Sequence, residues 1–289
     1  MSESDMHYSA QEQPVMRVRQ LRQQFGNGCP SCGDGQDDAV LEKNYCPQCG
    51  TVYALRDVSL DLYESEILGI VGESGSGKST LMSCLYFDQS PSHGEVTLRD
   101  YQPAATNVLT VSSQSRRQIR NYRLGMVYQN PLMGLRMNIS AVSNIAEKLI
   151  SAGSRHVGKI EGRAAGLLEH VNIPRFRMKD APRTFSGGMQ QRVQIAKALS
   201  NNPPILLLDE VTTGLDLSVQ ANVLDLVKTL QRELKISMLV VSHDLAVIRM
   251  LADRAMVMLN GRVVESGLTD QIMEDPQHPY TQQLVHSLL

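Results

Sequence analysis

The hydrophobic pattern of the chain predicts two kinds of strand. Over residues 16–25 and 51–62, apolar and polar residues roughly alternate, which is typical of strands with one buried face. Later, short apolar runs such as "ILLL" before Asp209 and "MLVV" before Ser242 are separated by stretches long enough for helices. Apolar strands that alternate with helices are typical of a parallel sheet with crossover helices. The pattern therefore predicts an α/β fold with half-buried strands near the N-terminus.

The middle of the chain predicts further strands and one long helical segment. "HGEVTLRD" and "LGMVYQ" are strand candidates, and residues 138–171 are predicted to be helical. The apolar positions that fall on one helix face are Ile139, Val142, Ile145, Ala146, Leu149 and Ile150. The preceding arginines, interpreted as a solvated helix face or else a contact for an acidic partner, are Arg116, Arg117, Arg120 and Arg123. Residues 1–15 are polar and predict a mobile tail.

Composition and charge narrow the class of protein. The 289 residues are 42% hydrophobic, and 28 Lys plus Arg against 30 Asp plus Glu leave a net charge of -2. This balance provides no overall basic field, so nucleic acid is not an expected partner. The apolar runs are far shorter than the roughly 20 residues that cross a bilayer, and the polar, acidic start does not resemble a signal peptide. We therefore expect a cytoplasmic protein, in which paired thiols favour a metal over a disulfide.

A glycine-rich loop is the first motif with its own chemistry. "GESGSGKST", residues 72–80, fits G-x-x-x-x-G-K-[ST] between a predicted strand and a predicted helix. Backbone N–H groups of such a loop surround phosphate oxygens, Lys78 would reach the β- and γ-phosphates, and Ser79 would hold magnesium. The predicted nucleotide contacts are Gly72, Ser74, Gly75, Ser76, Gly77, Lys78, Ser79 and Thr80. The motif predicts a binding site for a nucleoside triphosphate.

Two acidic residues at the end of an apolar strand complement that loop. In "ILLLDE", Asp209 is placed to hold magnesium, which carboxylates at this position often do through a water molecule. Glu210 faces the other way and could polarise the water that attacks the γ-phosphate. The two acids predict a hydrolytic site.

A third motif, "TFSGGMQQR", leads into a helix and predicts a second anion-binding helix end. At this point the chain resembles the ATP-binding-cassette (ABC) ATPases, whose signature L-S-G-G-Q appears as "FSGGM". The resemblance implies a core of the RecA type, an antiparallel β subdomain and a helical subdomain over about residues 130–186. It also implies a head-to-tail dimer with a second copy or a related ABC subunit. Ser186, Gly187 and Gly188 of one chain would then cover the ATP held by the other.

The remaining motifs of that family follow in order. The resemblance assigns Gln129 of "VYQNP" to magnesium and the attacking water, Asp216 of "TTGLD" to the dimer interface, and His243 of "VVSHD" to the γ-phosphate. Val211 departs from the common Glu-Pro of the family, but Glu210 itself is kept. The resemblance therefore implies an ATPase, with Glu210, His243 and Gln129 as catalytic residues and ATP and Mg²⁺ as ligands.

Two branches of the family are similar to this chain. The segment "HPYT" near the C-terminus resembles oligopeptide and dipeptide importer ATPases, which work with a membrane permease. "NPLMGLRMNISAVSNIAEKLISAGSRHVGKI" and "VVESGLTD" are more similar to the PhnK ATPases of the carbon–phosphorus lyase system, which breaks down phosphonates. This second resemblance implies a soluble lyase core complex as the partner, and the stretch between Gln129 and the signature is where partners dock.

Four cysteines form an insert that neither branch carries. Cys29 and Cys32 of "CPSCG", with Cys46 and Cys49 of "CPQCG", have the spacing of a tetrahedral zinc site. Iron, as a single ion or a cluster, and a redox dithiol are the alternatives. Cys84 stands apart and is interpreted as a small buried residue.

The insert, over residues 26–52 of the 16–289 ATPase domain, interrupts the predicted β subdomain where the family places an aromatic residue against adenine. Phe25, favoured by motif order, or Tyr53 could stack on the base. Zinc could simply hold the extension together, or the insert could contact a partner or shape the adenine pocket.

Overall fold

The computed structural model describes residues 13–38, 40–103 and 105–287. Of the predicted tail, residues 1–12 lie outside the described residues. Val15 is buried, donates its N–H to the carbonyl of Leu62 at 2.8 Å and accepts the N–H of Arg99 at 3.1 Å. The backbone is thus already joined to its neighbours one residue before the first strand.

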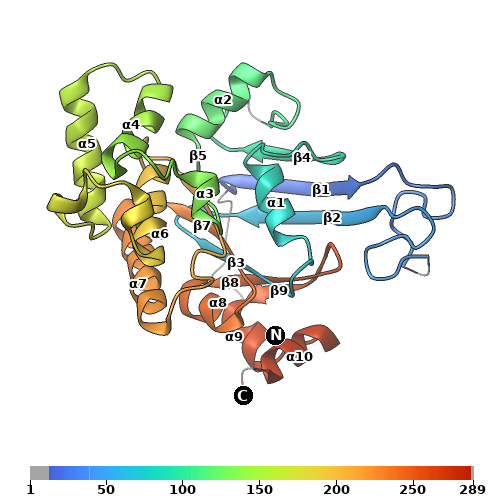
Figure 1. The fold of residues 1–289 in the computed structure, drawn as a ribbon. Helices are drawn as coiled ribbons and strands as arrows, with labels where there is room; N and C mark the ends of the chain where they lie inside the picture. Colours follow the sequence, from blue (N-terminus) through green and yellow to red (C-terminus); the bar gives the residue numbers. More distant parts are fainter. Residues whose placement is uncertain (1–12, 39, 104, 288–289) are drawn as a thin grey trace, which may run out of the picture.

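The central sheet has six strands in the order β5-β6-β7-β3-β8-β9 (Figure 1). Their bounds are β3 Ile67–Val71, β5 Leu124–Val127, β6 Ile205–Asp209, β7 Ser237–Ser242, β8 Arg254–Leu259 and β9 Arg262–Leu268. All but β9 run parallel, and every residue of β3, β5, β6 and β7 is buried. Helices on both faces of a parallel sheet require such continuously apolar strands. The predicted parallel sheet is confirmed.

A second sheet is antiparallel, with the order β2-β1-β4. Its strands are β1 Met16–Phe25, β2 Val52–Leu62 and β4 His93–Leu98. Met16, Val18 and Leu21 of β1 are fully buried in a core that also contains residues of helix α1 (Lys78–Leu85). The alternating pattern of the sequence is therefore explained by one apolar face that packs toward the central sheet. The cysteine insert extends from the far end of β1 and β2 (Figure 1).

The predicted long helix is two helices. α4 spans Ala141–Ser151 and α5 spans Val157–His170. Gly153 between them has φ +97°, a conformation that ends helices, and Ile150, expected on the apolar face, is 49% exposed. The helical prediction for residues 138–171 therefore holds for α4 and α5, and the turn at Gly153 separates the two helices and lets α5 fold back onto α4.

The other helices complete the fold. They are α2 (Ser113–Tyr122), α3 (Pro131–Gly134), α6 (Gly187–Ala198), α7 (Leu217–Leu234), α8 (Leu245–Leu251), α9 (Thr269–Glu274), α10 (Pro279–His286), and the 3-10 helices η1 (Arg175–Arg177) and η2 (Pro182–Thr184). Among the described helices, none combines the length and the apolar character that a bilayer crossing needs.

Candidate functional site

Four predicted motifs meet at one edge of the central sheet. The glycine-rich loop follows β3, Asp209 ends β6, His243 follows β7, and Gln129 lies two residues after β5. These strands are parallel neighbours in the order β5-β6-β7-β3. Their carboxyl ends therefore lie side by side, where open α/β sheets bind ligands.

The glycine-rich loop is held in shape by its own lysine. The Lys78 ammonium donates to the carbonyl oxygens of Gly72 at 2.7 Å and Glu73 at 2.8 Å. Burial lowers the pKa of Lys78, and the nearby Glu210 and Asp209 carboxylates oppose that effect. At Gly77, with φ +103°, a Cβ atom would lie 2.2 Å from the Ala54 carbonyl oxygen, so only glycine fits. The loop is thus preformed around a lysine whose charge a phosphate would neutralise.

Asp209 and Ser79 face each other across the sheet edge. The Ser79 hydroxyl donates to Asp209 Oδ1 at 3.1 Å, and burial raises the pKa of Asp209 to about 6. A hydroxyl and a buried carboxylate side by side are oxygen ligands suited to Mg²⁺. A bound cation would offset the cost of burying this carboxylate, so the pair fits a cation site.

We predict that Asp209→Asn stabilises the magnesium-free protein at neutral pH. The folded pKa, about 6, lies above the ordinary value of 3.8, so the contribution of Asp209 to stability is greatest at low pH and is lost as pH rises toward 6. Asn carries no such penalty. In EDTA, urea unfolding at pH 7.5 should show the variant more stable by about 1–3 kcal/mol, with the difference vanishing near pH 4. Asp225→Asn, on an exposed part of α7, is the control, and a loss of stability at pH 7.5 would contradict the prediction.

Three side chains converge on one oxygen of Glu210. Gln129 Nε2 and the Thr213 hydroxyl donate to Glu210 Oε2, each at 3.0 Å, and His243 Nδ1 lies 3.0 Å from the same atom. The Glu210 side chain is only 11% exposed. Hydrogen bonds to one oxygen leave the other oxygen of the carboxylate to accept a proton. The structure thus brings together all three residues that the sequence predicts to be catalytic.

Two glutamines that the sequence motifs did not indicate link this cluster to α6. Gln194 donates to the Tyr128 carbonyl at 3.1 Å and accepts the Tyr128 N–H at 3.2 Å, while Gln191 donates to the Gln129 carbonyl at 3.1 Å. Both amides are buried, and Gln194 also donates to Gln191 Oε1 at 2.9 Å. The spacing of "MQQRVQ" along a helix could have indicated them, since residues three apart share a face.

The signature residues form the start of α6. Ser186 is the N-cap, and its hydroxyl accepts the N–H of Met189 at 3.4 Å. Asp216 caps α7 in the same way through Val219 N–H at 3.0 Å, and these hydrogen bonds lower the pKa of Asp216. In the described residues, neither Ser186 nor Asp216 forms a hydrogen bond with the phosphate loop. Gly187 and Gly188 form the first turn, and a Cβ at Gly188 would lie 2.3 Å from Val219 Cγ1.

The same arrangement of motifs occurs in known proteins. A sequence model of the ABC transporter family matches residues 55–213, more than half of the chain. The chain belongs to the ABC transporter ATPase family. As a member, it has the fold and the ATP-hydrolysing activity of that family.

Individual members show how far the similarity extends. PhnK of Escherichia coli (strain K12), named for phosphonates utilization and ATP binding, is 49% identical over 233 residues, covering 81% of this chain and 90% of PhnK. The oligopeptide transport ATP-binding protein OppD of Bacillus subtilis (strain 168) is 38% identical over 264 residues, 88% of this chain and 70% of OppD. Among solved structures, the ATP-binding cassette MJ0796, a dimer in a post-hydrolysis state bound to ADP and Pi, matches with a TM-score of 0.72 and 28% sequence identity. The match covers 88% of this chain and 98% of the MJ0796 chain.

In this ABC ATPase the C-terminal helix also contacts the phosphate loop. The Tyr280 hydroxyl accepts the N–H of Glu73 at 2.7 Å. The segment ahead of α10 is fixed because Glu265 accepts the N–H groups of Gln277 at 2.9 Å and His278 at 3.0 Å. The "HPYT" motif therefore supports the ATP site, a role that its position in the sequence does not reveal.

We predict that Tyr280→Phe weakens ATP binding about twofold to fivefold, since one hydrogen bond contributes about 1 kcal/mol. The ring remains, so the packing of α10 should not change. Titration calorimetry with MgATP measures the effect. Tyr122→Phe removes a hydroxyl that bonds to the Ala152 carbonyl, remote from the loop, and serves as the control. An equal loss of affinity in both variants would contradict a specific role for Tyr280.

The two aromatic candidates for adenine stacking differ in exposure. Phe25 ends β1 and is 45% exposed, whereas Tyr53 is 2% exposed. The Tyr53 hydroxyl lies 3.1 Å from both Cys32 Sγ and the Gly33 carbonyl oxygen. Tyr53 is thus covered by the insert, which leaves Phe25 as the ring available to a base.

The four cysteines of the insert lie together. The Sγ atoms of Cys29, Cys32, Cys46 and Cys49 are all within 4.8 Å of one another, with neighbouring pairs at 3.5, 3.7 and 3.9 Å. Four thiolates about 2.3 Å from one tetrahedral ion would be about 3.8 Å apart. Hydrogen bonds from Tyr53 lower the pKa of Cys32, and those from Thr51 lower the pKa of Cys49 to about 6. The cluster fits a thiophilic metal ion, and Cys84, fully buried on α1, takes no part.

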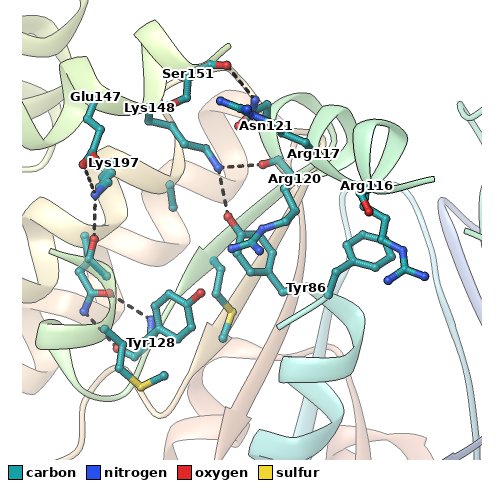
Figure 2. A pocket seen from close by; sticks show the side chains of 17 residues that line it. Tyr86, Arg116, Arg117, Arg120, Asn121, Tyr128, Glu147, Lys148, Ser151 and Lys197 are labelled. Carbon is teal, nitrogen blue, oxygen red and sulfur yellow. Dashed lines mark hydrogen bonds and ion pairs between the residues drawn. The ribbon is translucent and has the colours of Figure 1, made fainter. Parts of the chain in front are cut away.

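A cavity of about 440 Å³ lies between the core and the helical region (Figure 2). Arg116, Arg117 and Arg120 of α2 line one side, and Lys148 and Lys197 line the other. Of the four arginines predicted to form a solvated helix face, Arg117 is exposed, whereas Arg116, Arg120 and Arg123 are partly buried. Arg120 lies 4.4 Å above the Tyr86 ring and 3.1 Å from Asp88, and Arg116 donates to the Leu109 carbonyl at 2.6 Å.

Proposed function

We propose that two copies of this cassette, or one copy and a related ABC subunit, hydrolyse MgATP at head-to-tail interfaces. The observation that carries the residue assignment is the convergence of Gln129, Thr213 and His243 on Glu210, beside the Ser79–Asp209 pair. Each composite site would combine the phosphate loop of one chain with Ser186, Gly187, Gly188 and Asp216 of the other. The absence of hydrogen bonds between these two sets among the described residues is in keeping with a site completed by a second chain.

The proposed reaction gives each of these side chains a role. Lys78 and the loop N–H groups bind the β- and γ-phosphates, and Glu210 takes the proton of the attacking water. The new bond joins the water oxygen to the γ-phosphorus, the bond to the β-phosphate oxygen breaks, and ADP leaves with that electron pair. Gln129 and His243 hold Glu210 and the water. Ser79, Asp209 and Gln129 would hold magnesium, which would supply positive charge to the phosphate oxygens.

We further propose that ATP turnover drives a rearrangement in a cytoplasmic carbon–phosphorus lyase complex that breaks down phosphonates. The support is the 49% identity to PhnK over 90% of its length. The 38% identity to OppD keeps the ATPase of a peptide importer, with a permease as partner, as the second candidate. For either partner, we propose that the contact surface is the cavity lined by α2, α4 and α6. Lys148, which lines this cavity, belongs to the segment between Gln129 and the signature, where the family resemblance places the partner contact.

A pull-down from native lysate tests the partner. Recovery of soluble lyase subunits supports the first proposal, and recovery of a membrane permease contradicts it. Arg117→Glu reverses an exposed charge at the cavity mouth and should reduce recovery of the partner without changing basal ATP hydrolysis. Arg249→Glu, an exposed charge on α8, is the matched control and should leave recovery unchanged.

We propose zinc as the metal of the cysteine cluster, because the sulfur spacing and the knuckle turns suit it. Elemental analysis of purified protein should find about one zinc per chain; a single iron would instead give a coloured protein. After metal removal, four thiols should react with an alkylating reagent while Cys84 does not, since burial raises the pKa of Cys84 to about 12.

A further inference from the structure

We propose, on the basis of the ATP and zinc sites proposed above, that the metal in the cysteine insert holds the base end of the nucleotide site. Loss of the metal should weaken binding of the adenosine part of ATP and leave binding of the triphosphate part unchanged. The insert would then set the nucleotide affinity of this cassette, beyond stabilising its own fold.

The insert has too little apolar contact to be ordered by itself. Among the described residues, its buried cluster consists of Cys32, Leu41, Cys46 and Tyr53, with the partly buried Cys29 and Val40 packed against them. Ordering one residue costs about 1–2 kcal/mol of backbone entropy, and about 25 residues here share that small core. Small units of this kind require a metal or a disulfide. None of the five cysteines forms a disulfide. The conformation of the insert therefore depends on the ion.

Thr51 connects the metal ligands to the end of β1. Its hydroxyl oxygen lies 3.3 Å from Cys49 Sγ and accepts the N–H of Gly28 at 3.0 Å, while its carbonyl accepts the N–H of Cys46 at 2.8 Å. Thr51 is 1% exposed. At Gly26, φ is +119° and a Cβ would lie 2.5 Å from the Thr51 hydroxyl oxygen, so the chain directly after Phe25 packs against Thr51. The cluster thus fixes both residues that flank the Phe25–Val52 pair.

Phe25 is placed to meet the base of a nucleotide in the phosphate loop. It pairs with Val52, and Ala54, two residues further along β2, contacts the loop at Gly77. Two residues of a strand span about 7 Å, which separates an aromatic ring from the triphosphate site as a ribose would. The ring is 45% exposed, so a base can stack on it.

The phosphate loop has supports that do not pass through the insert. Gly261 donates its N–H to the Ser76 carbonyl at 3.1 Å, Lys78 bonds to Gly72 and Glu73, and Tyr280 bonds to Glu73. All of these contacts come from the core and the C-terminal region. The triphosphate site should therefore keep its shape when the insert loses its metal.

The test uses the full-length chain and two ligands, MgATP and magnesium tripolyphosphate, in titration calorimetry. The variant Cys29→Ser/Cys49→Ser removes two metal ligands, Phe25→Ala removes the ring, and Cys84→Ala is the matched control outside the insert. Because stacking of a base on an aromatic ring contributes severalfold to about a hundredfold in affinity, we expect about a tenfold weaker ATP affinity in the first two variants. Tripolyphosphate affinity should change less than twofold, and combining the cysteine and Phe25 changes should add little.

Each other result overturns the inference in a distinct way. Unchanged ATP affinity in a metal-free cysteine variant removes the link between metal and base. If the cysteine variant unfolds like the wild type but loses as much affinity for tripolyphosphate as for ATP, the insert supports the whole phosphate loop and not the base end. A wild-type protein that binds ATP but holds no metal refutes the zinc site, whereas a zinc-loaded protein that binds neither ligand refutes the proposed ATP site.

Discussion

Glu210→Gln should reduce the kcat of ATP hydrolysis about a hundredfold or more while ATP still binds. A positioned general base contributes about 10²–10⁴-fold to a rate, and glutamine keeps the size of the side chain but cannot take the proton. The hydrogen bonds from Gln129 and Thr213 to one oxygen survive if the new amide turns its oxygen toward them. Steady-state phosphate release and equilibrium ATP binding measure the two effects separately.

The dimer gives a second measurement for this variant. If ATP bound at the head-to-tail interface is not hydrolysed, the dimer should persist, and gel filtration with MgATP should show twice the monomer mass. Thr213→Val removes one hydrogen bond to the same carboxylate oxygen and should lower kcat far less, by a few-fold. Normal turnover in Glu210→Gln would exclude Glu210 as the base.

Lys78→Ala should abolish measurable ATP binding, with a loss of about a hundredfold or more in affinity. The ammonium would exchange its bonds to the Gly72 and Glu73 carbonyls for phosphate oxygens, and charged hydrogen bonds contribute about 1.5–3 kcal/mol each. Titration with ATP and with tripolyphosphate should show the same loss, since the lysine contacts only the triphosphate.

Ser79→Ala is the comparison that separates phosphate binding from magnesium binding. Its hydroxyl bonds to Asp209, so its removal should affect binding in magnesium and leave binding in EDTA almost unchanged. Lys78→Ala should lose affinity in both conditions. A Lys78→Ala protein that binds ATP normally in EDTA would show that the triphosphate lies elsewhere.

Local sequence was sufficient to predict the parts of the site that depend on the backbone. The apolar runs before Gly72, Asp209 and His243 predict buried parallel strands, and strands of one direction bring their following residues to one edge. The glycines of the loop and the capping residues of α6 and α7 are local requirements of turns and helix ends, so local sequence is sufficient to predict them. The spacing of the four cysteines similarly predicted that their sulfur atoms meet.

The tertiary structure alone decided contacts between segments far apart in the chain. Gln191 bonds to Gln129, which is 62 positions earlier in the chain, and Gln194 bonds to Tyr128, which is 66 positions earlier. Tyr280 bonds to Glu73 of the phosphate loop, which is 207 positions earlier. Phe25 and Tyr53 lie directly before and directly after the same insert, yet Phe25 is exposed and Tyr53 is buried. This difference depends on how the insert folds over β2. Such contacts depend on which side chains the packing of distant segments brings close together. The periodicity along one segment contains no information about which distant segments it will contact.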